Sequence, residues 1–535
     1  MTYSVCISPF IKVPASGTCL VLLAGLLCLF QTSAYSQNAK KVDTFIKGAW
    51  VFDGSGKDSM RLDVGITGDR ITYLEPAGKK APKAKKTIDA NGYYLAPGFI
   101  DPHTHVAADL SNPERKSNLA YLMQGVTTVF EGNDGSGPMP IGTTLAQWEQ
   151  NGIGTNAGLF VGHGSVRKEV LGEKDVQPTP SQLEKMKKLV AQAMEQGAYG
   201  ISTGLFYAPG SFAQQSEVVE LSKVAAAYGG IYDTHLRDES TYNIGLMNSI
   251  KETLEIGEAA GIPVHISHIK ALGADVWGKS PEVIQMIEAA QKRGLRVTAN
   301  QYPYLASRTN LIAAVVPRWA EDGGVKAMFA RFDDATLADS LRNGIRDNIR
   351  RRGGPASLVL STDNATLNGK SLEKVAQEWQ LDPVEAVFKV LRTDQKVRVV
   401  SFNMTEEDLL RFMKQPWVMT GSDGTPGHPR KYGSFTRKLK EYAIDHHHIS
   451  MANAIHSSTG LTAQTLGIQE RGLVKKGYYA DLILFQPQNL KDFATYEEPS
   501  NLASGMEYVF VNGVAAVQNG KATGALAGKA LKHKK

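Results

Sequence analysis

The stretch Gly98-Phe99-Ile100-Asp101-Pro102-His103-Thr104-His105 follows an apolar run that begins at Tyr93. The apolar run predicts a buried strand, and the two histidines stand two residues apart at its carboxyl end. Because side chains on a strand repeat with period two, His103 and His105 point in the same direction. Two imidazoles on one side of a strand end suit the binding of one metal ion. Taken alone, the motif is equally compatible with two surface histidines near a turn.

The middle of the chain alternates between predicted strands and helices. Strand-like segments at 231–235 and 295–300 are separated from their neighbours by segments with the apolar spacing of helices. The step from His235 to His268 is 33 residues, and the step from His268 to Gln301 is again 33. This regular step predicts the repeated strand–helix unit of a parallel barrel.

Two further patterns complete the predicted barrel. Ser181-Gln182-Leu183-Glu184 has the pattern of a capping box at the start of a helix. Residues 417–423 predict the eighth strand, which comes after a long excursion from about residue 305 to 410. A long excursion between two barrel strands predicts a lid over the site.

Both ends of the chain are rich in short strand patterns, unlike the middle. We therefore predict one discontinuous β-sandwich domain that is built from residues 42–97 and 466–535. Between its two parts lies the barrel domain, residues 98–465. The expected fold class is α/β, a TIM-like (β/α)8 barrel with a small β-sandwich domain from both chain ends.

The first residues predict a secretory signal peptide. Residues 19–30 form an apolar run too short to span a bilayer, Lys12 precedes the run, and small residues follow it. We expect residues 1–36 to be removed, which gives an exported, periplasmic or secreted protein without a stable membrane anchor. All three cysteines lie in this segment, so the mature chain is expected to contain no disulfide and no thiolate ligand.

The charge of the chain argues against a nucleic-acid partner. The formal net charge is +6 over 535 residues, and Lys and Arg are scattered rather than gathered in a long basic run. We therefore interpret the charged residues as solvated surface.

Polar residues recur at the predicted carboxyl ends of the barrel strands, where barrel enzymes place their active sites. We predict a metal site from four histidines and a carboxylate, with a second carboxylate as a catalytic base: His103, His105, Asp134, His235, His268 and Asp423. By strand alternation His265 is expected to face the helix layer, opposite to His268. His163 is expected to be structural, and the histidines at 446–448 are expected to be exposed.

The motifs resemble the amidohydrolase superfamily, and within it the N-acyl-D-amino-acid deacylase (D-aminoacylase) branch. The resemblance rests on the first strand motif together with four more: Thr234-His235-Leu236-Arg237, Ile266-Ser267-His268-Ile269-Lys270, Gln301-Tyr302-Pro303-Tyr304 and Gly421-Ser422-Asp423-Gly424. It implies hydrolysis of the amide bond of N-acyl-D-amino acids to a D-amino acid and a carboxylate. The implied cofactor is Zn²⁺, as one or two ions, with Mn²⁺ or Co²⁺ as alternatives.

The chain departs from this branch at one expected ligand. Where the branch typically has a cysteine after the second strand, this sequence has Asp134, and Glu131 is the competing carboxylate. Many other amidohydrolases use a carboxylated lysine at the fourth strand. Residues 200–204 contain no lysine, which argues against a hydantoinase or a dihydroorotase.

The resemblance also implies roles in the reaction. Asp423 would accept the proton of a metal-activated water and pass it to the leaving amine. The free carboxylate of the substrate would be held by Lys270, Tyr302 and Arg430, with Tyr207 nearby.

Two other functions remain open at this stage. One is an exported metallo-dipeptidase or another linear amidase on the same metal site. The other is a non-catalytic barrel that only binds a ligand. The sequence leaves open the acyl group, the preferred D side chain, the number of metal ions and the oligomeric state.

Overall fold

The computed structural model describes residues 41–534, and the predicted signal peptide lies outside the described residues. Among the residues described, no helix combines the length and the apolar character needed to cross a membrane.

Eight parallel strand positions form the central barrel, which confirms the predicted fold. The third position is divided between two short strands, and a parallel bridge between Thr104 and Gly424 closes the ring. In chain order the strands are β6 (Phe99–Asp101), β7 (Val126–Glu131), β8 (Asn156–Leu159) with β9 (Val161–Gly162), β10 (Gly200–Gly204), β11 (Ile231–His235), β12 (Val264–Ile266), β13 (Val297–Gln301) and β17 (Val418–Thr420).

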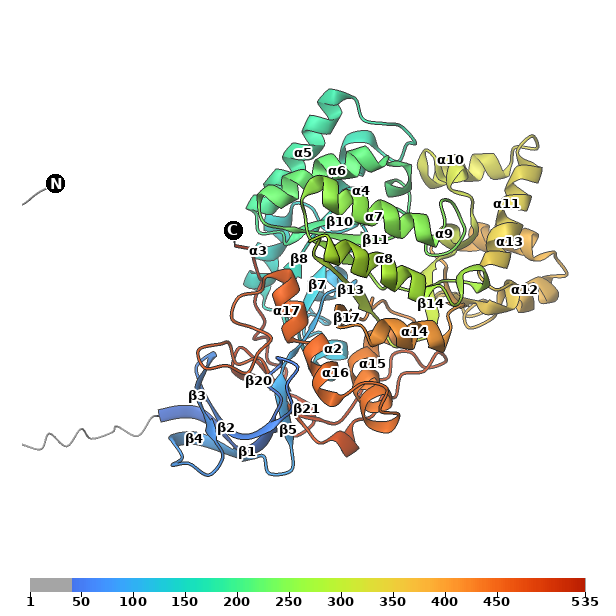
Figure 1. Cartoon of the computed structure of the whole chain (residues 1–535). Coiled ribbons are helices and arrows are strands. Elements are labelled where there is room, and N and C mark those ends of the chain that lie inside the picture. Colours follow the sequence, from blue (N-terminus) through green and yellow to red (C-terminus); the bar gives the residue numbers. More distant parts are fainter. Residues whose placement is uncertain (1–40, 535) are drawn as a thin grey trace, which may run out of the picture. The chain divides into compact units, whose positions relative to one another are not determined.

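Helices cover the outside of the barrel (Figure 1). The main ones are α3 (Ile141–Asn151), α4 (His163–Leu171), α5 (Pro180–Glu195), α6 (Gln215–Ala227), α7 (Leu246–Ala260) and α8 (Ser280–Lys292). The capping box of α5 consists of Thr179 and Gln182 rather than Ser181 and Glu184. The prediction was wrong by two residues because Pro180, which suits the first turn of a helix, starts the helix earlier.

Shorter elements complete the barrel domain. Two small helices follow the first strand, and a group of helices follows the eighth. These are α1 (Ala107–Leu110), α2 (Leu119–Leu122), α15 (Arg430–Arg437), the π-helix η5 (Lys438–Asp445), α16 (Met451–Ser457) and α17 (Gly460–Leu466).

Both ends of the chain contribute to one nine-stranded sheet, which is strongly curved (Figure 1). The two parts meet where β5 pairs antiparallel with β18. The strands are β1 (Lys41–Val51), β2 (Met60–Thr67), β3 (Arg70–Pro76), β4 (Lys83–Asp89), β5 (Tyr94–Pro97), β18 (Leu482–Phe485), β19 (Met506–Val511), β20 (Val514–Gln518) and β21 (Lys521–Ala522). The last residues leave this sheet, and Gly528 and Ala530 bridge to Ile153 and Ala157 beside the third barrel strand.

The long excursion between β13 and β17 folds into a subdomain with its own apolar core. Its antiparallel sheet has the order β14 (Ala306–Asn310), β16 (Arg398–Phe402), β15 (Leu358–Ser361). The accompanying helices are α9 (Leu311–Val315), α10 (Gly324–Phe332), α11 (Ala338–Arg351), α12 (Leu372–Trp379) and α13 (Pro383–Thr393). The excursion ends with α14 (Glu406–Met413), whose buried side chains belong to the core of the barrel. Residues of β14 and β16 line the main pocket, so the subdomain covers part of the site, while its motion as a lid stays a prediction.

Candidate metal centre

The two histidines of the first strand are fixed by the turn that follows β6. The Asp101 carboxylate accepts hydrogen bonds from the backbone N–H groups of His103 and Ser422, each over 3.1 Å. These bonds join the end of the first strand to the end of the eighth. The His103 side chain is fully buried, whereas 24% of the His105 side chain is exposed to the pocket.

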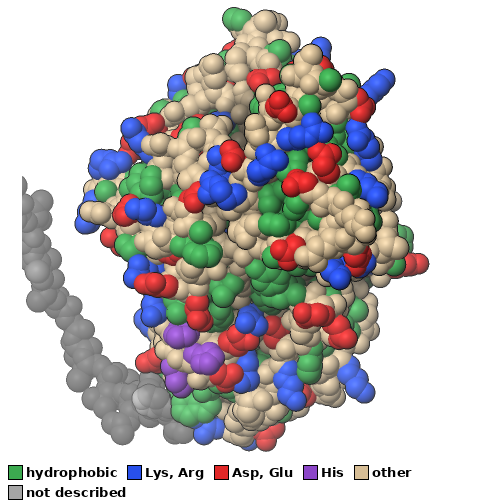
Figure 2. Space-filling view, turned by 90° about the vertical axis from the view of Figure 1, so that its right-hand side faces the viewer, with side chains coloured by type: hydrophobic (Ala, Val, Ile, Leu, Met, Phe, Trp, Pro, Cys, Tyr) green, Lys and Arg blue, Asp and Glu red, His purple; other side chains and the backbone are tan. Residues whose placement is uncertain are grey.

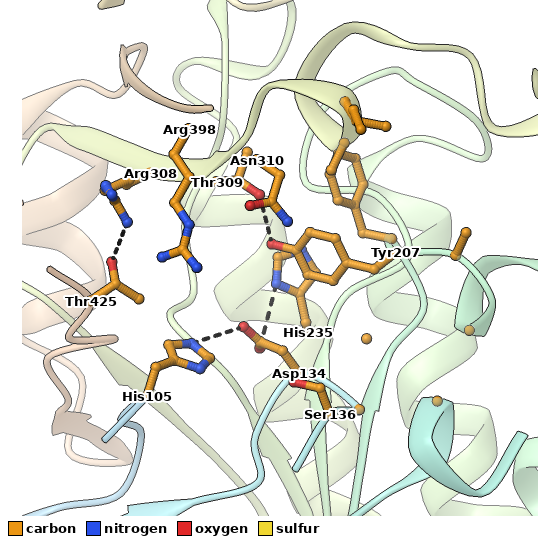
Figure 3. A pocket seen from close by; sticks show the side chains of 18 of the residues that line it. His105, Asp134, Ser136, Tyr207, His235, Arg308, Thr309, Asn310, Arg398 and Thr425 are labelled. Carbon is orange, nitrogen blue, oxygen red and sulfur yellow. Dashed lines mark hydrogen bonds and ion pairs between the residues drawn. The ribbon is translucent and has the colours of Figure 1, made fainter. Parts of the chain in front are cut away.

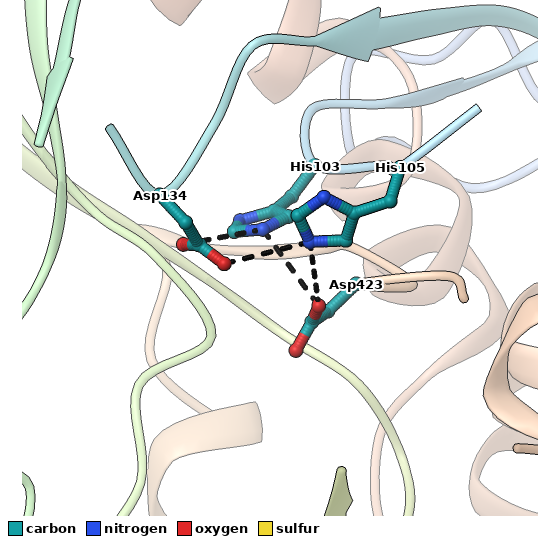
Figure 4. A group of neighbouring side chains, drawn as sticks. All are labelled: His103, His105, Asp134 and Asp423. Carbon is teal, nitrogen blue, oxygen red and sulfur yellow. Dashed lines mark hydrogen bonds and ion pairs between the residues drawn. The ribbon is translucent and has the colours of Figure 1, made fainter. Parts of the chain in front are cut away.

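Asp134 lies in the middle of the four predicted histidine ligands. Its Oδ1 atom lies 3.5 Å from His103 Nε2, 3.4 Å from His268 Nε2 and 3.6 Å from His235 Nδ1. Its Oδ2 atom lies 3.4 Å from His105 Nε2. Figure 4 shows the Asp134 carboxylate facing the two histidines of the first strand.

These side chains form two overlapping groups with the spacing of metal ligands. One group is His103, His105, Asp134 and Asp423, and the other is Asp134, His235 and His268. Asp134 is common to both, and a carboxylate with two oxygens can connect two neighbouring cations. The residues fit such ions, because the buried His103 Nε2 and Asp134 Oδ1 atoms have no hydrogen-bond partner among the described residues.

The competing carboxylate is occupied elsewhere. Glu131 Oε2 accepts hydrogen bonds from the backbone N–H groups of Val106 and Ala107, the second over 3.0 Å, at the start of α1. Glu131 belongs to neither group of metal-ligand spacing. The geometry therefore favours Asp134 as the carboxylate ligand.

Three residues of the centre have positive backbone φ angles: Asp134 at 56°, His268 at 33° and Asp423 at 47°. Such angles are uncommon outside glycine and cost of order 1–3 kcal/mol each. Each of the three residues comes after a barrel strand has ended. The chain thus leaves the regular strand geometry where it directs a side chain to the centre.

The end of regular strand geometry before His268 explains why the prediction for His265 was wrong. Val264 faces the helix layer, since a Cβ added to Gly257 of α7 would lie 2.3 Å from Val264 Cγ2. His265 therefore faces the barrel interior, where its Nδ1 lies 2.9 Å from Thr298 Oγ1 and its Nε2 accepts from Asn300 Nδ2 at 2.8 Å. The prediction assumed that side chains alternate between the two faces of the strand as far as His268. It was wrong because β12 ends at Ile266, so His268 does not continue the alternation.

Burial lowers the pKa of His265 to about 3, so this histidine is neutral below the metal centre. His163 is buried and pairs with Glu217 over 2.7 Å, away from the centre, as a structural residue would. His446 and His447 are exposed.

Glu239 is a member of the site that the sequence motifs do not single out. Its Oε1 atom lies 3.1 Å from His268 Nδ1 and 2.6 Å from Lys270 Nζ. Burial alone would raise the pKa of Glu239, but Lys270 and the two histidines outweigh it and lower the pKa. A carboxylate behind a ligating imidazole fixes the orientation of the ring. In the sequence, Glu239 could have been found from its position four residues after the predicted ligand His235.

Lys270 and Arg430, the predicted substrate-binding cations, both contact acidic groups of the chain. Besides its contact with Glu239, Lys270 Nζ lies 2.7 Å from His268 Nδ1. Arg430 Nη1 lies 2.8 Å from Asp423 Oδ2. Their contact with substrate stays a prediction.

The two predicted tyrosines lie at the same pocket. The Tyr302 hydroxyl is buried without a hydrogen-bond partner among the described residues, and the Tyr302 ring lies 4.7 Å from the Arg430 guanidinium. The Tyr207 hydroxyl accepts a hydrogen bond from Thr309 Oγ1 over 3.2 Å.

The metal-ligand groups open into a pocket of about 690 Å³. Barrel strand ends form its floor, and β14 and β16 form part of its wall (Figure 3). On the molecular face shown in Figure 2, cationic and anionic side chains are interspersed, and no basic stripe is seen. The pocket has the size of a small-molecule site.

The fold and this centre define a metal-dependent hydrolase of the amidohydrolase class. A family model described as "Amidohydrolase family" matches residues 86–517, and the chain belongs to this family. D-aminoacylase of Alcaligenes xylosoxydans xylosoxydans is 32% identical over 92% of this chain and 98% of its own length. N-acyl-D-glutamate deacylase of the same organism is also 32% identical, over 89% of this chain and 94% of its own length.

Solved structures agree with these sequence relatives. A D-aminoacylase structure, described with a binuclear metal centre, has a TM-score of 0.78, 31% identity and coverage of 92% of this chain and all of that one. An N-acyl-D-glutamate deacylase from Bordetella bronchiseptica, complexed with zinc and a phosphonate inhibitor, has a TM-score of 0.79 and 29% identity, with the same coverage. Similarity to hydantoinases at 15% identity extends to the fold alone.

Proposed function

We propose that the chain hydrolyses the amide bond of N-acyl-D-amino acids and releases a D-amino acid and a carboxylate. The observation that carries this proposal is the convergence of four histidines on Asp134, in a chain that matches D-aminoacylase over nearly the whole length of both proteins.

We further propose zinc as the resident ion, as one or two ions. Imidazole nitrogens and carboxylate oxygens are suitable zinc ligands. Because Asp134 supplies oxygen rather than a thiolate, Mn²⁺ and Co²⁺ also suit the site. A divalent cation held there would lower the pKa of a water molecule and polarise the scissile carbonyl.

Asp423 would move the proton of the reaction. Its Oδ1 atom lies 3.2 Å from His105 Nε2, at the edge of the ligand group, while Arg430 holds Oδ2. Burial alone would raise the pKa of Asp423, but Arg430 and the neighbouring histidines outweigh it and lower the pKa. Asp423 is therefore ionised before the reaction, as a general base must be, and can give its proton to the leaving nitrogen.

The α-carboxylate of the substrate would bind beside Asp423. The Tyr302 hydroxyl and Arg430 Nε are buried donors without partners among residues 41–534. Arg430 can therefore orient Asp423 with one nitrogen and offer another N–H group to the substrate. Lys270 adds positive charge behind them, and Tyr207 lies across the pocket.

The test is a panel of N-acetyl-D-amino acids, their L enantiomers and dipeptides, assayed by release of free amine. We expect hydrolysis of D substrates and its loss after chelation of metal, with recovery on adding Zn²⁺. Faster hydrolysis of dipeptides would instead make the chain a dipeptidase. Binding of a D substrate by metal-replete protein without any turnover would indicate a non-catalytic barrel.

A further inference from the structure

Two arginines on neighbouring strands of the inserted subdomain line the pocket. Arg308 lies on β14 and Arg398 on β16, and Arg398 pairs in register with Asn310, two residues from Arg308. Side chains on a strand alternate, so both arginines project from the same face of the small sheet. Figure 3 shows the Arg398 guanidinium in the pocket above His105, with Arg308 beside it.

Neither arginine has a carboxylate partner among the described residues. Arg308 contacts only hydroxyl groups through its terminal nitrogens, Thr425 Oγ1 at 3.1 Å and Ser361 Oγ at 3.2 Å, and its buried Nε has no partner among residues 41–534. Among residues 41–534, the Arg398 side chain makes no hydrogen bond and no ion pair.

Other charged side chains around the pocket are mostly paired. Lys168 Nζ lies 2.6 Å from Glu173 Oε1, and Arg318 Nη1 lies 2.7 Å from Glu321 Oε1. Arg430 and Lys270 contact Asp423 and Glu239, as described above. Arg308 and Arg398 lack such a partner among the described residues, as do the pocket-lining Arg352 and Lys396. They differ from those two cations because they lie on paired strands and project from the same sheet face.

The two guanidinium groups also oppose each other electrostatically. Burial, together with the charges of Arg398 and Arg430, lowers the pKa of Arg308 to about 9. Partly buried like charges without a counter-charge are unfavourable, and an anionic ligand would relieve this cost. A planar guanidinium can bind a carboxylate through two parallel hydrogen bonds.

We propose that Arg308 and Arg398 bind a second carboxylate of the substrate, in addition to the α-carboxylate. This inference rests on the proposed function and narrows it to N-acyl-D-amino acids with two carboxylates. The second carboxylate belongs either to an acidic D side chain or to an anionic acyl group. Sequence similarity does not show whether the substrate has a second carboxylate, since D-aminoacylase and N-acyl-D-glutamate deacylase are equally identical to this chain.

The experiment compares substrates that differ in one charge. N-acetyl-D-glutamate is paired with N-acetyl-D-glutamine, and N-succinyl-D-alanine with the derivative whose succinyl carboxylate is an amide. We expect a higher kcat/KM for the charged member of at least one pair. Arg308→Gln and Arg398→Gln should each lower that charged-to-neutral ratio about ten- to hundredfold, as expected for lost hydrogen bonds to a charged group. The pair that responds identifies the position of the second carboxylate.

A matched control is Lys396→Gln, because Lys396 is an exposed cation at the same pocket, two residues before Arg398. It should leave the ratio within about twofold, since an exposed charge interacts weakly through water. Arg398→Lys should restore part of the ratio, and circular dichroism of each variant establishes that the fold is intact.

Two results would overturn the inference. The first is a wild-type protein whose kcat/KM is no higher for the charged member than for the neutral member of either pair. Equal losses on both members of each pair in the arginine variants would assign them to the α-carboxylate instead. If no N-acyl-D-amino acid is hydrolysed, the proposed function fails on its own. Calorimetric Kd values of the metal-replete protein for the same pairs then test the inference without activity.

Discussion

Arg430 holds one oxygen of the Asp423 carboxylate at 2.8 Å and leaves the other oxygen facing His105 Nε2 at 3.2 Å. Both side chains are almost completely buried, so the ion pair is little screened by water. The pairing gives Arg430 a role that the sequence motifs alone do not reveal. It fixes the direction in which the proposed base points and keeps that base ionised.

The first prediction concerns this pair. Asp423→Asn should keep the fold and the metal content but lower kcat by about two to four orders of magnitude, because an amide cannot accept the proton. Steady-state kinetics with metal analysis checks this. Turnover within a few-fold of wild type would show that Asp423 is not the proton acceptor.

A second prediction separates positioning by Arg430 from charge alone. Arg430→Lys keeps a cation but loses the geometry that holds Oδ2 and offers Nε to the substrate. We expect kcat to fall and KM for N-acyl-D-amino acids to rise together. Arg437→Lys is a control on the same helix, since Arg437 pairs with Glu441 outside the metal centre. Equal effects of both variants would argue against a specific role for Arg430.

The third prediction tests the carboxylate ligand. Asp134→Ala should lose metal and activity together, because it removes the one carboxylate common to both ligand groups. Glu131→Ala should keep the metal, since Glu131 contacts backbone N–H groups of α1 instead. Asp134→Cys should retain zinc, which accepts thiolate readily. Metal analysis of the three purified variants decides. A metal-replete Asp134→Ala beside a metal-free Glu131→Ala would make Glu131 the ligand.

The barrel and the cluster at its rim are predictable from the sequence because both follow from a regular repeat. The 33-residue step predicts His235 and His268 at neighbouring strand ends; in the structure His235 ends β11, His268 lies just beyond the end of β12, and both reach Asp134. The side-chain direction of His265 was not predictable in the same way. It depends on where β12 ends, and the positive φ of His268 has no signature in the sequence.

Other features depend on contacts between segments far apart in the chain. Arg308 and Arg398 are separated by 90 residues, and only the pairing of β14 with β16 brings them to one pocket wall. Arg430 and Lys270 stand in recognisable motifs, but the motifs do not show that Asp423 and Glu239 are their neighbours. The pattern of residue types in the sequence was therefore enough to predict the candidate metal centre. The ion pairs around that centre could be identified only from the structure.

The fourth prediction concerns the pH dependence of stability. Lys438 is buried and donates to Thr420 Oγ1 at 2.8 Å and Ser457 Oγ at 2.9 Å, and burial lowers its pKa to about 7. An unfolded lysine titrates near 10.4, so between these values the unfolded state binds more protons and stability rises with pH. Relative to Lys438→Met, the wild-type free energy of unfolding should therefore rise by up to about 1.4 kcal/mol per pH unit above pH 7. Denaturant unfolding at pH 7 and pH 9 measures it, and a constant difference would contradict the assigned pKa.

The last prediction concerns Glu239, which contacts His268 Nδ1 on the side of the ring away from Asp134. A carboxylate in this position orients the imidazole and increases its basicity as a ligand. Glu239→Gln keeps the shape but removes the charge, and we expect metal affinity to fall about ten- to hundredfold.

The matched control is Glu217→Gln, because Glu217 is also a buried carboxylate that contacts a histidine, His163. That pair lies outside both ligand groups, so the substitution should change stability without changing metal affinity. Titration of each apoprotein with Zn²⁺ against a competing chelator gives the affinities. If the two ions bind with separate affinities, the loss in Glu239→Gln should fall on the ion held by His235 and His268. A loss confined to the ion of His103 and His105, or an equal loss in Glu217→Gln, would show that Glu239 acts on the fold rather than through His268.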